Sequence, residues 1–300
     1  MAAQPTLKQL RYLCQLAYHQ HFGRAAEASN ISQSTLSAAI NELEDILNAA
    51  LVERSNKHVI ITELGKQVVA RAEAILTDVE DLSAACKAAS QPFGGSIRLG
   101  VIPTVAPFIL PKLVKNLREQ EPQFKLFIRE DKSAGLTQAL RNGELDVLLL
   151  ALPYACENSK TMHLFNDRFV LAYPKGNELE QRKNLQSQDL RKQPLLLLED
   201  GHCLRDHALA ASQLRSDEIS IPFEATSLNT IVQMVANGIG VTLLPQLALD
   251  TGILHDTAIK TRELPNKEGH REIGLMWRKR SPREKEYRLL GELIQRYFAK

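Results

Sequence analysis

The stretch that decides the fold is Pro194–Asp206, which reads PLLLLEDGHCLRD. Its four leucines are typical of a buried parallel strand, and the Glu-Asp-Gly that follows predicts a turn. Cys203 then lies near the start of a predicted helix that runs to about Leu214, with His202 beside it and Arg205 two residues later. The positive end of a helix and neighbouring basic groups favour a thiolate, the form that peroxide oxidises. The alternative is a buried cysteine that serves as a small apolar side chain.

Around this stretch, strand-like and helix-like segments alternate over residues 96–300, which predicts an α/β fold with mostly parallel sheets. Ligands of such sheets bind at the carboxyl ends of the strands. Thr104, Ser133, His202-Cys203 and Thr226-Ser227 occupy four of these positions, which predicts a site for a small polar or anionic molecule. The expected strands are Ser96–Val101, Lys125–Glu130, Val147–Leu150, Arg168–Ala172, Pro194–Leu198, Val241–Leu244 and Ile273–Arg278.

The first 62 residues predict two helices, a tight turn and a polar-faced third helix that ends near Leu47, the pattern of a helix-turn-helix. The segment Leu51–Thr62 reads as a two-stranded wing. An ordinary three-helix core is the alternative, because the residues up to Gly65 include five basic and six acidic side chains. The expected DNA-binding residues are Ser32, Gln33, Ser34, Thr35, Ser37, Asn41, Arg54 and Lys57.

A long helix over residues 63–90 is predicted next, and residues 91–95 form a linker. The apolar positions of this helix repeat every three or four residues and form a narrow seam, which favours pairing with a second copy of the chain. The seam consists of Leu64, Val68, Ala72, Ile75, Val79, Leu82 and Cys86.

Composition excludes several classes of protein. No apolar run reaches the roughly twenty residues of a membrane helix, and the N-terminus lacks a signal region, so we expect a cytoplasmic protein without membrane association. Neither the histidines nor the four cysteines (Cys14, Cys86, Cys156 and Cys203) show metal-ligand spacing, so we expect no metal and no cofactor.

Several motifs resemble those of the LysR-type transcriptional regulators. They are Phe22–Ala26 followed by Ser32–Ser37, then Leu43-Glu44, Glu53-Arg54 and Leu64-Gly65, and Gly238–Pro245 near the other end. Within that family, Ile102–Pro107 and Leu198–Asp206 are similar to the OxyR group, which senses hydrogen peroxide.

The resemblance implies a winged helix-turn-helix (residues 1–62), a dimerisation helix (63–90), a linker (91–95) and an α/β effector domain (96–300). The effector domain is expected to contain two subdomains like those of periplasmic binding proteins, 96–167 with 272–300, and 168–271. The implied partners are double-stranded promoter DNA, further copies of the chain in a homodimer or homotetramer, RNA polymerase, and hydrogen peroxide as effector.

Carried over to this sequence, the resemblance makes Cys203 the peroxidatic cysteine, with Thr104, Ser133, His202 and Asp206 at the peroxide. Ser212 departs from the pattern, because the resolving cysteine of the group normally stands there. Three explanations are open: an engineered Cys-to-Ser change, which we favour, a natural sensor that stops at sulfenic acid, or resolution by another thiol such as Cys156. With Ser212 we expect the disulfide-driven step to be weakened or absent.

Three functions compete on these residues. The leading hypothesis is a DNA-binding regulator that senses hydrogen peroxide at Cys203 and activates antioxidant genes. The second is a LysR-type regulator that binds a small metabolite between the subdomains, with Thr104, Ser133 and Thr226 as carboxylate ligands. The third is a thiol enzyme, which we do not expect, because no second cysteine lies nearby in sequence to regenerate the thiolate.

Overall fold

A computed structural model describes residues 4–54, 59–90, 93, 95–183, 185–214, 220, 223–264 and 269–298. Its internal contacts divide the chain into two units, Met1–Lys87 with Arg141–Glu144, and Ala88–Leu140 with Leu145–Lys300. In the described ranges, no helix is both long enough and apolar enough to cross a membrane.

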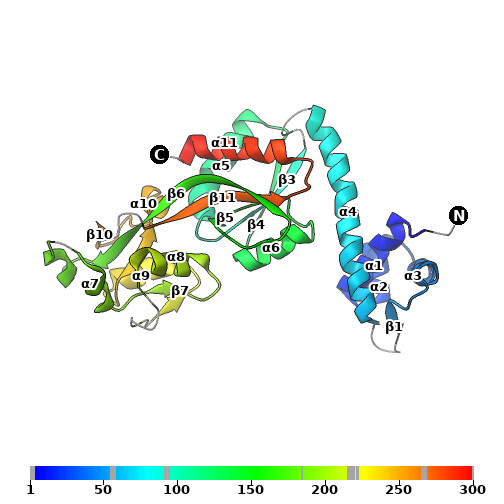
Figure 1. The fold of residues 1–300 in the computed structure, drawn as a ribbon, viewed down its shortest axis with the longest axis horizontal. Helices are drawn as coiled ribbons and strands as arrows, with labels where there is room; N and C mark the ends of the chain where they lie inside the picture. The colour runs from blue at the N-terminus through cyan, green and yellow to red at the C-terminus, as the bar shows by residue number, and fades with distance from the viewer. Residues whose placement is uncertain are drawn as a thin grey trace. The chain divides into compact units, whose positions relative to one another are not determined.

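The first unit contains the predicted helices and wing (Figure 1). Thr6 caps the first helix through a capping box with Gln9, and the Ser32 side chain accepts the Thr35 N–H at the start of the third. Leu36, Ile40 and Leu43 of that third helix lie in the buried core of the unit. The elements are α1 (Leu7–His19), α2 (Phe22–Ala28), α3 (Gln33–Leu47), β1 (Val52–Arg54), β2 (Val59–Ile61) and α4 (Glu63–Ser90), with β1 and β2 antiparallel.

Two close contacts fix the wing against the helices. Glu44 on α3 accepts the backbone N–H groups of Leu51 and Val52 at 2.7 and 3.0 Å, so its carboxylate holds the first wing strand. Gly65 lies against the same strand, because a Cβ atom there would come within 2.2 Å of the Leu51 carbonyl oxygen. These contacts explain the positions of Leu43-Glu44 and Leu64-Gly65 relative to the wing.

The predicted seam of α4 is divided between two environments. Val68 and Ala72 pack against the core of the first unit. Four other seam residues are large apolar side chains that remain exposed in the single chain, and the side chain of Cys86 lies outside the described residues. Pairing of α4 with a second copy stays a prediction. The exposed residues are Leu64, Ile75, Val79 and Leu82.

The second unit is built on a seven-stranded sheet with the order β10-β6-β11-β5-β3-β4, in which β9 also pairs with β6 (Figure 1). A separate pair, β7 and β8, is parallel, as expected for the leucine run. The strands are β3 (Ser96–Val101), β4 (Lys125–Glu130), β5 (Val147–Leu152), β6 (Ser159–Pro174), β7 (Leu197–Leu198), β8 (Glu224–Ala225), β9 (Thr242–Pro245), β10 (Ile259–Glu263) and β11 (His270–Arg278).

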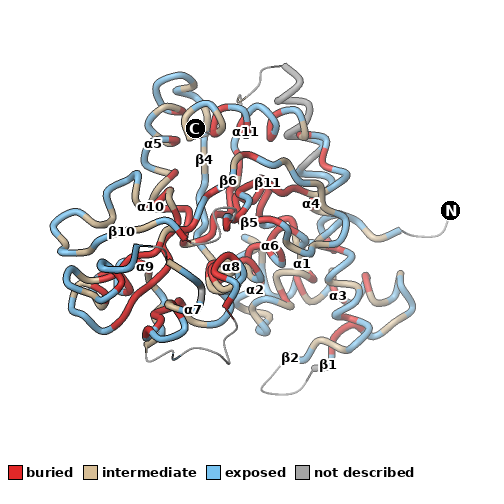
Figure 2. Tube along the Cα trace, turned by 60° about the vertical axis from the view of Figure 1, so that its left-hand side comes forward, coloured by how far each residue is buried: buried red, intermediate tan, exposed pale blue. Residues whose placement is uncertain are grey.

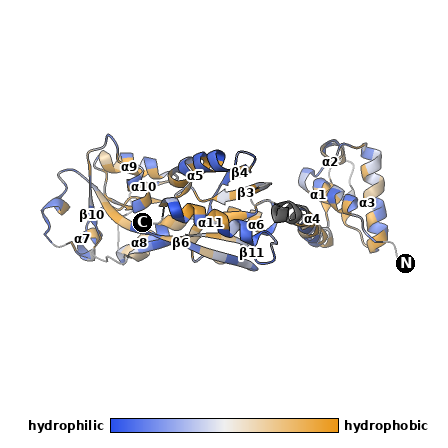
Figure 3. Cartoon of the chain, turned by 90° about the horizontal axis from the view of Figure 1, so that it is seen from above, coloured by the Kyte–Doolittle hydropathy of each residue, from blue (hydrophilic) through white to orange (hydrophobic). Residues whose placement is uncertain are grey.

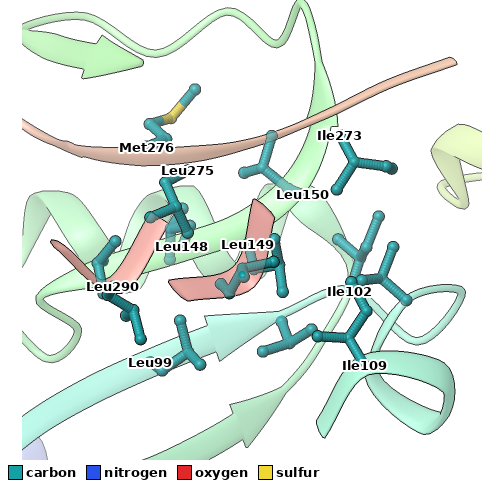
Figure 4. Close-up of a cluster of buried hydrophobic side chains, with 14 of the residues drawn as sticks. Leu99, Ile102, Ile109, Leu148, Leu149, Leu150, Ile273, Leu275, Met276 and Leu290 are labelled. Atoms are coloured by element: carbon teal, nitrogen blue, oxygen red, sulfur yellow. The ribbon is translucent and has the colours of Figure 1, made fainter. Parts of the chain in front are cut away.

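Helices cover this sheet, and two separate apolar cores result. The first core includes Leu99, Leu149 and Leu275 (Figure 4). The second core runs from Phe169 to Leu264. Buried residues follow the central strands in Figure 2, and the helices carry both hydrophilic and hydrophobic residues in Figure 3. The helical elements are α5 (Ala106–Gln120), α6 (Ser133–Arg141), η1 (Glu178–Gln181), α7 (Ser187–Arg191), α8 (Cys203–Ser212), α9 (Leu228–Ala236), α10 (Gln246–Asp250) and α11 (Glu284–Phe298).

The two-core arrangement matches the predicted α/β effector domain, but the expectation of mostly parallel sheets is wrong. β3 is parallel to β4 and β5, whereas β6 is antiparallel to β9, β10 and β11. β6, a 16-residue strand of which only Arg168–Ala172 was expected, makes three of these antiparallel pairs, and β11 is also antiparallel to β5. β6 leaves the first core after Leu164 and enters the second at Phe169. The subdomain limits themselves remain a prediction.

Replacing Gly65 with alanine should destabilise the first unit by about 1–3 kcal/mol, because the new methyl group meets backbone that cannot move aside. Thermal unfolding of the full chain measures the change. Gly95→Ala is the matched control, since no atom lies within 4 Å of the added Cβ. Equal midpoints for the two variants would contradict the close contact.

Candidate functional site

A small cavity lies where residues from both cores meet. Its volume is about 10 Å³, roughly the space that one water molecule needs. The loop between β3 and α5 forms one wall, the start of α6 another, and the turn before α8 the third. The lining residues are Ile102, Pro103, Thr104, Lys132, Ser133, Gly201, His202 and Cys203.

Three helices begin at this cavity. Ser133 is the first residue of α6, Cys203 is the first of α8, and Thr104 lies two residues before Ala106, where α5 begins. The N-terminus of a helix carries partial positive charge and unpaired N–H groups. The site therefore favours an anion, whether a thiolate or a hydroxide that leaves a reacting molecule.

Two buried polar atoms of the lining have no hydrogen-bond partner among the described residues. They are the Oγ of Ser133 and the Nε2 of His202, in residues that are 2% and 6% exposed. Buried polar groups nearly always have partners, so an unpaired pair in one cavity indicates a bound polar molecule. A molecule the size of water or hydrogen peroxide would satisfy both atoms.

Thr104 is oriented by a buried ion pair. Arg271 donates from Nη1 to the Thr104 Oγ at 2.8 Å and from Nη2 to the Thr104 carbonyl at 3.0 Å. The same guanidinium donates to one oxygen of Asp167, and the other oxygen accepts the Leu247 N–H at 2.9 Å. Arginine can only donate, so the threonine oxygen accepts and its hydroxyl proton remains available to a ligand.

Cys203 connects the two cores. Its side chain is half-buried and packs against the first core, whereas Leu204 and Ala208 of the same helix belong to the second. It also lines the cavity with the Thr104 and Ser133 hydroxyls and the His202 imidazole. This placement differs from that of a cysteine sealed among hydrocarbon side chains.

Two residues expected at the site do not line the cavity. Asp206 is exposed, because it lies on a face of α8 that points to solvent. Thr226, which the metabolite hypothesis requires, is exposed in the loop after β8. Thr226 was expected from the strand-end pattern and Asp206 from the resemblance, and neither gives the direction of the side chain.

Ser212 is the last residue of α8, nine positions after Cys203. That separation corresponds to roughly 13–14 Å along a helix, whereas a disulfide needs Cα atoms about 4.4–6.8 Å apart. The serine is 1% exposed and donates to the Leu209 carbonyl at 3.0 Å. Its hydroxyl is therefore satisfied within an intact helix.

Sequence reasoning missed three residues near the site: Lys132, His207 and Arg271. Lys132 lines the cavity, and Arg271 holds Thr104. His207 lies one helical turn after Cys203 on α8. The spacing from Cys203 could have indicated His207, but no local pattern marks Arg271, which is 167 positions from Thr104.

The other described cysteines have different surroundings. Burial raises the pKa of the Cys14 thiol to about 12, with a further contribution from Glu73, so this cysteine stays a thiol at neutral pH. Cys156 is half-buried beside the first core. Within the described segments, no group of three or more metal-binding side chains comes together.

The candidate DNA interface is the polar face of α3. Its side chains are exposed or, for Ser37, half-exposed, while the opposite face is buried. The Ser32 hydroxyl also lies 2.7 Å from that of Thr35. Lys57 and the side chain of Arg54 lie outside the described residues. The described residues of this face are Ser32, Gln33, Ser34, Thr35, Ser37 and Asn41.

Comparison with known proteins gives matches over nearly the whole chain. Residues 7–66 match the bacterial regulatory helix-turn-helix protein, lysR family, and residues 90–299 match the LysR substrate binding domain. The regulator EstR of Acinetobacter baylyi is 38% identical over 301 residues, covering 100% of this chain and 99% of that protein.

Two solved structures are also similar. A full-length OxyR of Pseudomonas aeruginosa with one Cys-to-Asp substitution is 33% identical, with a TM-score of 0.79 and coverage of 98% and 95% of the two chains. A Cys-to-Ser mutant of Corynebacterium glutamicum OxyR with bound H₂O₂ is 32% identical, with a TM-score of 0.68 and coverage of 100% and 94%.

Replacing Arg271 with methionine should destabilise the second unit by about 3–5 kcal/mol, because the buried Asp167 carboxylate loses its only charged partner within the described hydrogen bonds. Chemical denaturation of the full chain measures this loss. Lys160→Met, which removes a partly exposed ion pair with Glu284, should cost much less. A similar cost for both variants would contradict the network.

The stability of the second unit should fall as pH falls from about 7 to about 5. Burial lowers the pKa of His202 and His207, helped by Lys132 and Arg271 respectively. Below about pH 6.5 the unfolded chain therefore binds more protons than the folded chain, and the free energy of unfolding decreases. Denaturation at several pH values should show a smaller slope for His202→Gln and His207→Gln, and an unchanged slope would refute the assignment.

Proposed function

We propose that this chain, which belongs to the LysR family of bacterial transcriptional regulators, senses hydrogen peroxide through oxidation of Cys203. The observation that carries the proposal is the cavity where a cysteine at a helix start faces two unpaired polar atoms and has room for one very small molecule. Members of this family regulate transcription, so the chain is not an enzyme.

The reaction begins with hydrogen peroxide in the cavity. Thr104 donates its hydroxyl proton to one peroxide oxygen, since its own oxygen accepts from Arg271, and the Ser133 hydroxyl holds the molecule from α6. The Cys203 thiolate attacks the nearer oxygen, an S–O bond forms, and the O–O bond breaks. The sulfur is oxidised to sulfenic acid, and the second oxygen leaves as hydroxide.

His202 steers the proton in this step. Its buried Nε2 has no hydrogen-bond partner among the described residues, so a neutral imidazole can take the thiol proton and return it to the leaving hydroxide as water forms. The three helix starts stabilise both the thiolate and the hydroxide. Asp206 has no direct contact in this scheme, because it is exposed.

The first step of the reaction ends at the sulfenic acid, and in this chain no disulfide with position 212 can follow. A disulfide between positions 203 and 212 would require α8 to unwind, and serine cannot form that bond. The alternatives for Ser212, an engineered change, a natural one-cysteine sensor or resolution by Cys156, lead to different signals from the same first step. In each of them the subdomain interface near Cys203 is what changes.

The signal passes to promoter DNA through the helix-turn-helix. The exposed face of α3 enters the major groove, and dimers or tetramers formed partly by α4 place two or more copies on the operator. In the proposed cytoplasmic regulator, oxidation changes the spacing of these copies, and RNA polymerase is recruited to antioxidant genes.

A metabolite sensor is less well supported. The cavity next to Thr104 and Ser133, at about 10 Å³, fits a very small molecule better than an organic acid. A larger hollow of about 440 Å³ lies elsewhere in the second unit, between Val170, Leu254 and Arg262, and none of the proposed carboxylate ligands lines it.

Treating the full chain with a small excess of hydrogen peroxide and then with a sulfenic-acid trap should label Cys203, as read by peptide mass spectrometry. Operator footprinting before and after peroxide should change for this chain and not for Cys203→Ala. A chain with Ser212→Cys should form the disulfide instead of the trapped adduct and show a larger footprint change. An intramolecular Cys203 disulfide in the unsubstituted chain, or no labelling at all, would refute the proposal.

A further inference from the structure

We propose that Lys132 is a positioning residue for the reaction at Cys203, because it ties the turn that starts α8 to the loop that starts α6. This inference rests on the function proposed above. Lys132 was not marked by any sequence pattern, and it contacts the turn from the opposite wall of the cavity.

The contact between the two walls is direct. The Lys132 ammonium lies 2.5 Å from the Glu199 carboxylate and donates to the Asp200 carbonyl at 3.2 Å. Lys132 belongs to the segment just before α6, and Glu199 follows β7. The ion pair thus joins the strand ends of the two cores at the edge of the cavity.

The turn leaves room for this lysine. Gly201 has a φ of +89°, a conformation that residues with a side chain rarely adopt. A Cβ atom at this position would lie 3.4 Å from the lysine Cδ, so the lysine stem packs over the glycine. The conformation of the turn therefore favours glycine here, whereas the lysine stem lies at an ordinary contact distance from it.

The ion pair between Lys132 and Glu199 affects the protonation of His202 more than it affects the stability of the fold. Its side chains are 38% and 39% exposed, and exposed pairs of this kind contribute little to folding. The Glu199 carboxylate also lies 3.9 Å from the His202 Nε2, between the imidazole and the ammonium. Lys132 and Glu199 are the two charged groups found to act on this ring.

The two charges act on His202 in opposite directions. Burial lowers the pKa of the imidazole, the Lys132 charge lowers it further, and the Glu199 charge raises it. Lys132 thus helps to keep His202 neutral, the form that can accept the thiol proton. Removing either Lys132 or Glu199 would loosen the turn in the same way. Removing Lys132 would raise the pKa of His202, however, whereas removing Glu199 would lower it.

The opposite directions of these two pKa changes provide a test, because a purely structural role of Lys132 would not produce opposite shifts in the two variants. The rate of Cys203 oxidation in the full chain is measured against pH, by trapping the sulfenic acid after timed exposure to hydrogen peroxide. Lys132→Met should move the rise of the rate to higher pH by about half a unit, and Glu199→Gln should move it to lower pH by a similar amount. Lys132→Arg keeps the charge and should restore the profile of the unsubstituted chain.

Lys160→Met is the matched control, because Lys160 is also 2.5 Å from a carboxylate and 40% exposed, yet lies away from the cavity. It should leave the profile unchanged. Shifts in the same direction for Lys132→Met and Glu199→Gln, or no shift in either, would overturn the role of Lys132.

A second readout separates this inference from the proposed function. The titration of His202 is followed by NMR in the same variants without peroxide, and the same opposite shifts are expected. If Cys203 is never oxidised but the His202 titration shifts as expected, the sensor function fails and the Lys132 placement stands. If Cys203 is oxidised but neither the rate profile nor the His202 titration shifts in the variants, the sensor function stands and the role of Lys132 fails.

Discussion

The arrangement of the second unit depends on a buried ion pair between Asp167 and Arg271. The two residues face each other across β6 and β11, at the place where β6 passes from the first core to the second. Burying two charges is costly unless they are paired and fully hydrogen-bonded, and here Thr104 and Leu247 complete the bonding. Through these bonds the ion pair connects the loop after β3, which contains Thr104, to the start of α10, which contains Leu247. A structural change at the ion pair therefore affects both cores.

The same network sets the chemistry of the cavity. Because Arg271 donates to the oxygen of Thr104, the hydroxyl proton of the threonine stays available as a donor to whatever enters. His202 and Ser133 supply unpaired atoms on the other walls, and the three helix starts supply positive potential. The cavity volume of about 10 Å³ favours a very small molecule over a larger metabolite. Selectivity in this site therefore comes from size and from fixed donors rather than from a large complementary surface.

Local sequence patterns predicted the elements well and their long-range partners poorly. The helix-turn-helix, the wing, α4, β3, β4 and α11 follow from periodicity and capping, which act within a few residues. Strand direction was mispredicted because β6 is long, polar along part of its length, and antiparallel to its neighbours. Thr104, Ser133, His202 and Cys203 were found because each follows the carboxyl end of a strand, although β7 pairs with β8 in a separate sheet. Arg271 and Lys132 could not be found in this way, since their partners lie far away in sequence.

Oxidation without a disulfide still has a physical route to the rest of the molecule. In the proposed sensor, an oxygen added to Cys203 must fit a cavity of about 10 Å³ near two ion pairs of the described residues, a buried one between Asp167 and Arg271 and an exposed one between Lys132 and Glu199. The buried pair resists separation, because breaking it leaves an uncompensated charge in the interior. The exposed pair can exchange its partner for water or for the new sulfur oxygen at little cost. Strain from the added oxygen is therefore expected to open the turn at Glu199 first, while the junction at Asp167 holds. In this order the start of α8 moves before the subdomains do, and a sensor with serine at position 212 can give a graded response where a disulfide would give a complete rearrangement.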